Sequence, residues 1–332
     1  MSALVVMLGR EGPAAETRLA ECRAVAERLG GGLDLQFVNA DQPVEQIVEQ
    51  CRNALVIFPG GVRVLTPEVV AKLPNLRLIQ TFSAGTDSLD IAALEDLGVA
   101  VANNGGANAV AVAEHAIALM IAVYRKLDVQ IDSVKAGTWM AGVAGDRTEF
   151  HTLVDKRVGI VGLGRIGSRV AKRLAGWECE LVYHDIVDLD EEHVRATGAR
   201  RVPFDELLST SDIVTLHVPL DRKTRHMLSD REFAMMKPTA ILINTCRGPV
   251  VNETALIRAL RSGEIFAAGL DVTEVEPVPP DSPLPTMPNV IVTPHLATRA
   301  VESEWNAAEN AVTNAVRIAR GEEPLWVVAP VD

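Results

Sequence analysis

The sequence predicts an α/β protein built from two doubly wound parallel-sheet domains. Short apolar runs rich in Val, Ile and Leu alternate with longer segments of helical period along the whole chain. This alternation is typical of βα units around parallel sheets. The chain is also 332 residues long, about twice the usual size of a single domain. Together, these two observations favour a two-domain α/β architecture.

The first hundred residues form the smaller of the two expected units. Five apolar runs, separated mostly by helical segments, mark its strands. The turn-rich stretch Asn103–Gly106 ends this unit, and Asn108 is a candidate cap for a long helix that runs to Lys126. The expected strands are Leu4–Leu8, Leu33–Phe37, Ala54–Phe58, Leu76–Thr81 and Val99–Ala102.

A second series of strands follows, again separated mostly by helices. Its first strand leads into a glycine-rich turn, and a final helix runs from about Ala300 to Arg320. There is no long linker and no internal repeat. The expected strands are Arg157–Val161, Glu180–Asp185, Ile213–Val218, Ala240–Asn244, Ala267–Asp271 and Val290–Thr293.

The composition is that of an ordinary globular protein. Hydrophobic residues make up 48% and charged residues 23% of the chain, which excludes a disordered or fibrous protein. The 4 cysteines are scattered without a Cys-x-x-Cys pair, so we expect neither a metal site nor disulfide bonds. No apolar run reaches the roughly 18 residues of a membrane span, and the N-terminus lacks the pattern of a signal peptide. We therefore expect a cytoplasmic protein.

The net charge argues against two classes of partner. The formal charge is −12 at pH 7, whereas nucleic acids and anionic membranes favour a basic face. We expect no nucleic-acid or membrane partner. Small anionic ligands stay possible, because they respond to local charge.

The sharpest local motif is a glycine-rich turn. Gly162, Gly164 and Gly167 form a G-x-G-x-x-G pattern directly after an apolar strand and at the start of a helix. This is the context that a dinucleotide site needs, because the first glycine allows a tight turn, the second lets the backbone approach a pyrophosphate and the third lets the helix pack closely. The free N–H groups of the helix N-terminus favour phosphate binding.

An acidic residue lies where the ribose of a dinucleotide is expected. Asp185 ends the next strand, 18 positions after Gly167. A carboxylate there accepts hydrogen bonds from the ribose of NAD and repels the additional phosphate of NADP. The sequence therefore predicts NAD as the cofactor.

Candidate site residues follow several other expected strands. Pro219, Arg247, Asp271 and His295 each lie at or just past a strand end, and Glu276 lies five positions beyond Asp271. Ligands of open parallel sheets bind at the carboxyl ends of the strands. These scattered positions are therefore expected to line one crevice.

The residue types fit the reduction of a 2-oxo acid. Arginine presents a planar fork to a carboxylate and stays charged, and histidine can act as acid in one direction and base in the other. A carboxylate on the other ring nitrogen would orient the histidine and stabilise the imidazolium. Spacing alone leaves Glu276, Glu274, Asp271 and Asp281 as possible partners of His295.

These motifs resemble those of the D-isomer-specific 2-hydroxyacid dehydrogenases over nearly the whole chain. By this resemblance, Arg247, Glu276 and His295 are the catalytic residues. The backbone of Ser83, Ala84 and Gly85 is expected to help bind the substrate carboxylate. The matching stretches are Ser83–Asp90, Val112–His115, Gly162–Gly167, His217–Pro219, Asn244–Gly248, Asp271–Pro277 and Pro294–His295. The expected cofactor contacts are Gly162, Gly164, Arg165, Ile166, Gly167, Asp185, Val218, Pro219, Thr245, Cys246, Arg247, Asp271 and His295.

The resemblance also implies a discontinuous organisation. A flavodoxin-like substrate domain would comprise residues 1–102 and 297–332, and a Rossmann domain that binds NAD would comprise residues 103–296. Family members are typically dimers joined largely through the segment between the first domain and the glycine motif. A homodimer is therefore expected.

Departures from the family pattern narrow the substrate. Thr81–Gly85 contains no basic residue that would bind a phosphorylated substrate, and Ala84 replaces the lysine of phosphite-oxidising relatives. Formate-oxidising relatives lack the acidic residue at Glu276. The remaining class is a small unphosphorylated 2-oxo acid or D-2-hydroxy acid, such as glyoxylate or hydroxypyruvate.

Several alternatives stay open at this point. Cys246 is either a tightly packed residue or an oxidation-sensitive thiol, and Trp139 or Trp305 could shape the substrate pocket. The rival function is a non-catalytic, NAD-sensing interaction protein of the same fold.

Overall fold

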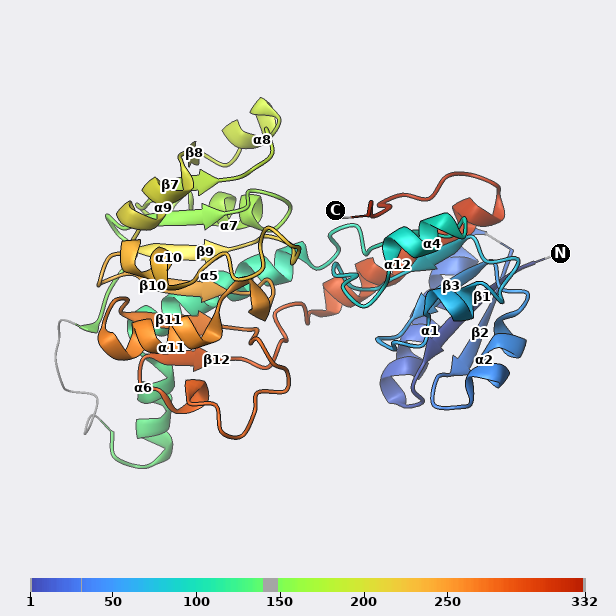
Figure 1. The fold of residues 1–332 in the computed structure, drawn as a ribbon, viewed down its shortest axis with the longest axis horizontal. Helices are drawn as coiled ribbons and strands as arrows, with labels where there is room; N and C mark the ends of the chain where they lie inside the picture. The colour runs from blue at the N-terminus through green and yellow to red at the C-terminus, as the bar shows by residue number, and fades with distance from the viewer. Residues whose placement is uncertain (1, 31, 140–148, 331–332) are drawn as a thin grey trace. The chain divides into compact units, whose positions relative to one another are not determined.

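The computed structural model describes residues 2–30, 32–139 and 149–330. It divides into two compact units (Figure 1). Unit 1 comprises Met1–Asn108 and Arg299–Asp332, and unit 2 comprises Ala109–Thr298. The chain therefore leaves unit 1 after its first hundred residues and returns to it at the end.

Unit 1 is built on a five-stranded parallel sheet in the order β2-β1-β3-β4-β5. This is the flavodoxin-like doubly wound order. The strands are β1 (Ala3–Gly9), β2 (Leu33–Asn39), β3 (Val56–Pro59), β4 (Leu78–Gln80) and β5 (Ala100–Ala102). The helices are α1 (Pro13–Leu29), α2 (Val44–Cys51), α3 (Pro67–Val70), α4 (Ile91–Asp96) and α12 (Val301–Ala319).

Both faces of this sheet are buried. Along β1, Val5 and Met7 join a core that includes residues of α1 and α12, whereas Val6 and Leu8 join a core with α2, α3 and α4. Successive side chains of a strand point to opposite faces, so a strand covered on both sides is apolar at every position. Figure 1 shows the red helix α12 among the blue elements of unit 1.

Unit 2 contains a seven-stranded sheet in the order β12-β11-β10-β9-β6-β7-β8, with parallel pairing throughout. The order reverses between β6 and β9, which is the topological switch point of a Rossmann fold. The strands are β6 (Arg157–Val161), β7 (Glu180–His184), β8 (Arg200–Arg201), β9 (Ile213–Leu216), β10 (Ile241–Asn244), β11 (Ala267–Leu270) and β12 (Val290–Val292). The helices are α5 (Ala109–Arg125), α6 (Leu127–Lys135), α7 (Gly167–Leu174), α8 (Glu191–Arg195), α9 (Phe204–Thr210), α10 (Asp230–Met235) and α11 (Glu253–Ser262).

The predicted fold class of two doubly wound parallel sheets is confirmed, with two local differences. The edge strand β8 was not predicted, because its two arginines lack the apolar pattern of a strand. The expected cap at Asn108 is wrong. Helix α5 begins at Ala109, but the buried side-chain oxygen of Asn108 accepts no hydrogen bond. Instead, a turn in which Ala107 N–H donates to the Asn104 carbonyl leads into the helix.

Helix α5 packs against β10, β11 and β12 of the unit 2 sheet. Nine of its residues are buried, among them Leu119 and Val123. Close packing is possible because Gly269 of β11 has no side chain: a Cβ there would lie 3.1 Å from Leu119 Cβ and 3.2 Å from Val123 Cγ2. Among the described residues, no helix is long and apolar enough to cross a membrane.

Gly269→Ala should therefore destabilise the protein. The added methyl would crowd Leu119 and Val123 and would also lie 3.0 Å from Ile243 Cδ1. Overpacking of this kind costs about 1–3 kcal/mol of the free energy of unfolding. Denaturant unfolding followed by circular dichroism measures the change. Gly176→Ala is the control, because a Cβ there meets nothing within 4 Å; equal midpoints for the two variants would contradict the prediction.

Candidate active site

The glycine-rich loop lies between β6 and α7 at the switch point of the sheet. Gly162 has φ of +88°, and a Cβ there would lie only 2.6 Å from the carbonyl oxygen of His217. A Cβ on Gly167 would fall onto the Gly162 carbonyl oxygen, whereas one on Gly164 would meet nothing within 4 Å. Gly162 and Gly167 are thus needed for the turn itself, and Gly164 leaves open space beside the backbone.

Asp185 follows β7 and is hydrogen-bonded to the glycine-rich loop. Its Oδ2 accepts the Leu163 N–H at 2.9 Å and its Oδ1 accepts the Val187 N–H at 3.0 Å. Arg201 donates through Nη2 to the Asp185 carbonyl at 2.8 Å, while its Nη1 pairs with Asp188 at 2.6 Å. The Asp185 carboxylate is thereby held in one orientation, and its remaining lone pairs suit a ribose diol.

His295 and Glu276 form a close hydrogen-bonded pair. Nδ1 of His295 lies 2.7 Å from Oε2 of Glu276, and both side chains are partly exposed, at 40% and 37%. The other carboxylate oxygen, Oε1, accepts the Thr273 N–H at 3.1 Å. Since Nδ1 is engaged by the carboxylate, Nε2 is the nitrogen that can exchange a proton with a substrate.

Asp271 holds the turn that contains His295. The side chain of Asp271 is 1% exposed, and its two oxygens accept the N–H groups of Leu296 (3.0 Å) and Ala297 (2.9 Å). The Asp271 carbonyl accepts the His295 N–H at 2.8 Å. His295 adopts φ of +54°, a left-handed conformation that is uncommon for residues other than glycine. Asp271 therefore stabilises the backbone of His295 instead of pairing with its ring.

The other possible partners of His295 lie elsewhere. Glu274 Oε1 is 2.7 Å from Nε2 of His226, and Glu274 Oε2 accepts the Glu253 N–H at 3.1 Å. Asp281 is exposed at the surface. Of the four carboxylates considered from spacing, Glu276 is the one that the structure places within hydrogen-bond distance of the His295 ring.

A hydrogen-bond chain from α5 reaches the same turn, and sequence reasoning missed it. Nε2 of His115 lies 3.0 Å from the Thr293 hydroxyl, which donates to Asp271 Oδ1 at 2.6 Å. The partners are separated by 178 residues in the chain. The parallel pairing of β11 with β12, which sets Leu270 beside Val292, brings Thr293 to Asp271. The packing of α5 on the same strands brings His115 to Thr293.

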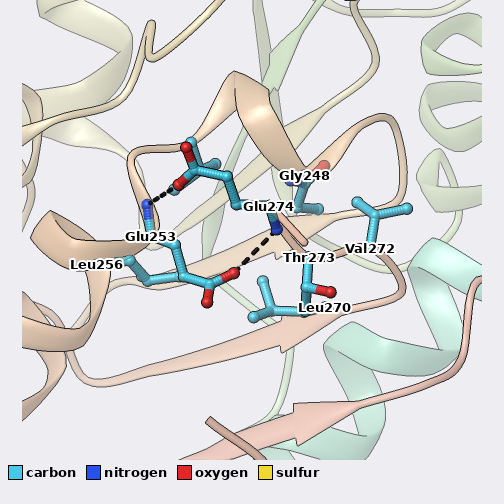
Figure 2. Close-up of a pocket in the computed structure, with 9 residues that line it drawn as sticks. Gly248, Glu253, Leu256, Leu270, Val272, Thr273 and Glu274 are labelled. Atoms are coloured by element: carbon cyan, nitrogen blue, oxygen red, sulfur yellow. Dashed lines mark hydrogen bonds between the residues drawn. The ribbon is translucent and has the colours of Figure 1, made fainter. Parts of the chain in front are cut away.

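Arg247 follows β10. Its Nη1 donates to the Cys246 carbonyl at 2.8 Å, and its own carbonyl accepts from Asn244 Nδ2 at 3.0 Å. A Cβ on the next residue, Gly248, would fall onto the carbonyl oxygen of Thr273. The loop after β10 thus packs directly on the loop that contains Glu276, as Figure 2 shows for Gly248 and Thr273.

Buried polar atoms without partners lie beside these loops. Nδ1 of His217 and Oγ1 of Thr245 are buried and have no hydrogen-bond partner among the residues that the structure describes. Burial lowers the pKa of His217 to about 3, so its ring is neutral at ordinary pH. Unpaired buried polar groups are costly, and partners from a bound dinucleotide would remove that cost.

Cys246 is a packed residue in this structure. Burial raises the pKa of its thiol to about 11, and its Sγ donates to Asn244 Oδ1 at 3.1 Å. Since the thiolate is the reactive form, this environment disfavours the alternative of an oxidation-sensitive thiol.

The expected substrate loop belongs to unit 1. The Ser83 carbonyl accepts from Thr81 Oγ1 at 2.8 Å and from the Asn104 N–H at 3.1 Å. The Ser83 hydroxyl donates to the Gly85 carbonyl at 2.8 Å. These bonds set the turn. Trp305 also belongs to unit 1, and Trp139 belongs to unit 2; both are exposed.

A parallel sheet with this order, a glycine loop at its switch point and a carboxylate after the next strand defines a dinucleotide-binding oxidoreductase fold. The model of the D-isomer specific 2-hydroxyacid dehydrogenase NAD-binding domain matches residues 117–297. The chain belongs to this family and is an NAD-dependent enzyme.

Relatives match over most of their length. The chain is 38% identical to a glyoxylate reductase of Thermofilum pendens, over 79% of this chain and 77% of the relative. It is 39% identical to glyoxylate/hydroxypyruvate reductase B of Citrobacter koseri, over 87% and 89%. The crystal structure of a glyoxylate reductase from Paecilomyes thermophila matches with a TM-score of 0.84 and 30% identity, covering 98% of each chain.

The position of Asp185 predicts a preference for NADH over NADPH. The 2′-phosphate of NADPH would meet the fixed Asp185 carboxylate, and the hydrogen bonds from the ribose hydroxyl to this carboxylate would be lost. Such bonds contribute about 1.5–3 kcal/mol each. We therefore expect kcat/KM to be roughly 10- to 100-fold higher with NADH than with NADPH. Asp185→Ala should narrow the gap chiefly by weakening NADH binding. Steady-state kinetics with both cofactors measure the ratio. Equal values for the wild type would contradict the prediction.

Proposed function

We propose that the protein reduces a small unphosphorylated 2-oxo acid, of the glyoxylate or hydroxypyruvate type, to the D-2-hydroxy acid with NADH. The contact of 2.7 Å between His295 Nδ1 and Glu276 Oε2 supports this most directly, because it leaves an acid–base group at the carboxyl ends of the strands. The matched reductases named above support the substrate class.

In this proposal, His295 is the general acid of the reduction. Its protonated ring gives a proton from Nε2 to the carbonyl oxygen of the substrate. The Glu276 carboxylate orients the ring and stabilises its positive charge, as in other carboxylate–histidine pairs. In the reverse direction, the neutral ring accepts the proton of the hydroxyl group.

Arg247 binds and polarises the substrate. Its guanidinium presents a planar, two-pronged donor to the carboxylate. We assign Ser83, Ala84 and Gly85 of unit 1 to the same carboxylate through their backbone. The uncharged turn Thr81–Gly85 supports an unphosphorylated substrate, because a phosphoryl group would call for a basic side chain there.

The cofactor is assigned to unit 2. The open space beside Gly164 and the unpaired atoms of His217 and Thr245 fit a dinucleotide there. When bound, NADH supplies the hydride that the protein itself cannot provide. The residues proposed to hold it are Gly162, Gly164, Arg165, Ile166, Gly167, Asp185, Val218, Pro219, Thr245, Cys246, Arg247, Asp271 and His295.

We further propose a cytoplasmic homodimer, with residues 1–102 and 297–332 as the substrate domain and 103–296 as the NAD-binding domain. An apolar stripe on α6 supports the dimer. Leu127, Ile131 and Val134 are exposed and lie on one helix face at spacings of four and three residues. Residues 140–148 of the segment expected at the dimer interface lie outside the described residues.

A panel of 2-oxo acids with NADH tests the proposed activity. Loss of absorbance of the reduced cofactor reports turnover, and glyoxylate or hydroxypyruvate should give the highest kcat/KM. A phosphorylated 2-oxo acid serves as the contrasting substrate. A preference for it would contradict the substrate class, and no turnover with any acid would favour the NAD-sensing alternative.

Variants of the acid–base pair test the mechanism. His295→Ala should lower the rate of reduction by roughly 10²- to 10⁴-fold, the usual size of a general acid–base contribution. Glu276→Gln keeps the shape but removes the charge that stabilises the imidazolium formed when the ring takes up a proton, so the rate of reduction should also fall. Steady-state rates of reduction measure both effects. Wild-type rates in His295→Ala would exclude this histidine as the acid.

A further inference from the structure

Two carboxylates that no step of the mechanism uses join the loops that contain Arg247 and Glu276. Glu253 begins α11, just after the Arg247 loop, and Glu274 lies two residues before Glu276. Oε2 of Glu274 accepts the Glu253 N–H at 3.1 Å, and Oε2 of Glu253 accepts the Glu274 N–H at 2.9 Å. Figure 2 shows both bonds, which form a closed reciprocal pair that we call the Glu253–Glu274 clasp.

The clasp satisfies backbone groups that would otherwise lack partners. The Glu253 N–H lies in the first turn of α11, where backbone donors have no partner within the helix. A carboxylate is a favourable acceptor there because it also interacts with the positive end of the helix dipole. The bonds are charge-assisted and therefore stronger than bonds between neutral groups.

A third side chain closes the clasp against the Arg247 loop. Nε2 of His226 lies 2.7 Å from Glu274 Oε1, and the His226 N–H donates to the Pro249 carbonyl at 2.8 Å. Pro249 belongs to the turn directly after Arg247 and Gly248. Glu274 is therefore connected to the segment after Arg247 at two points, directly at Glu253 and through His226 at Pro249.

Thr273 links the clasp to the Glu276–His295 pair. The Thr273 N–H donates to Glu276 Oε1, and its carbonyl oxygen is the atom on which Gly248 packs. A shift of residues 273–274 would therefore move Glu276 relative to Arg247. Small displacements of this kind affect rate strongly, because catalysis depends on the alignment of the reacting groups.

We propose that Glu274 and Glu253 are positioning residues that keep Arg247 in register with the Glu276–His295 pair. The inference rests on the proposed function, because it assumes that these three residues act on one substrate. A purely structural cap at α11 would change stability and leave kcat unaltered. A positioning role requires that kcat depends on the length of the side chain at position 274.

The test compares Glu274→Gln, Glu274→Asp and Glu274→Ala. Glutamine keeps the length, so its amide oxygen can still accept the Glu253 N–H while its amide nitrogen donates to Nε2 of His226. Aspartate keeps the charge but is one methylene too short. We expect kcat near the wild-type value for Gln and a loss of about 10- to 100-fold for Asp and Ala. NADH affinity, measured by fluorescence titration, should change much less than kcat, by less than about threefold, because the proposed phosphate and ribose contacts, the glycine loop and Asp185, follow β6 and β7, whereas the clasp joins the loops after β10 and β11.

The control is Glu264→Ala, an exposed glutamate just beyond the other end of α11, which should have wild-type kinetics. The double variant Glu253→Ala/Glu274→Ala should lose little more kcat than either single variant, since each single variant already removes the clasp. If Glu274→Ala does not fold, the comparison of kcat between Glu274→Gln and Glu274→Asp still tests the proposal. Wild-type kcat in Glu274→Asp, or equal losses in Gln and Asp, would overturn the proposal.

Hydrogen exchange separates this inference from the proposed function. Amide exchange at residues 272–276 should accelerate in Glu274→Asp and stay unchanged in Glu274→Gln and Glu264→Ala. If the wild type turns over none of the 2-oxo acids, the proposed function fails, while exchange still reports whether the clasp holds the loop. If the wild type is active and exchange accelerates without loss of kcat, the positioning role alone is overturned.

Discussion

The geometry of the active site depends on one buried carboxylate, Asp271. A buried charge is tolerated only when it is hydrogen-bonded or paired, and here the partners of Asp271 are the backbone of residues 296–297 and the Thr293 hydroxyl. Meeting this requirement forces the chain after β12 to turn sharply at His295. The left-handed backbone there costs on the order of 1–3 kcal/mol, and the hydrogen bonds to Asp271 offset it. The ring of His295 is thereby brought to Glu276.

The parallel sheet of unit 2 makes this arrangement possible. β10, β11 and β12 are adjacent and in parallel register, so their following loops leave from one edge. Two of these loops touch through backbone atoms at Gly248 and Thr273. The loops of the site therefore support one another through direct contacts. A side chain such as Glu276 consequently lies close to its partners.

Much of this could be predicted from the sequence because it depends on local patterns. The periodicity of apolar residues located the strands and the two sheets, and the glycine spacing located the loop after β6. The interpretation failed where long-range pairing decides the structure. β8 consists of two arginines that join the sheet only because β7 lies beside them, and the bond between His115 and Thr293 depends on α5 packing on the sheet. Asn108 has the chemistry of a cap, but the preceding turn leaves its side-chain oxygen without a donor. The roles of the site residues remain predictions.

The return of the chain to unit 1 determines the order in which the protein can fold during synthesis. Residues of α12, among them Ala308 and Val312, complete the core over one face of the first sheet. In a growing chain, α1 packs on that face without α12 until the ribosome has released residues beyond 300. Unit 2 ends at Thr298, and its described strands all precede that point. Although unit 1 is synthesised first, unit 2 is the first that can bury its whole core, and the part of the unit 1 sheet that α12 later covers stays exposed on the nascent protein.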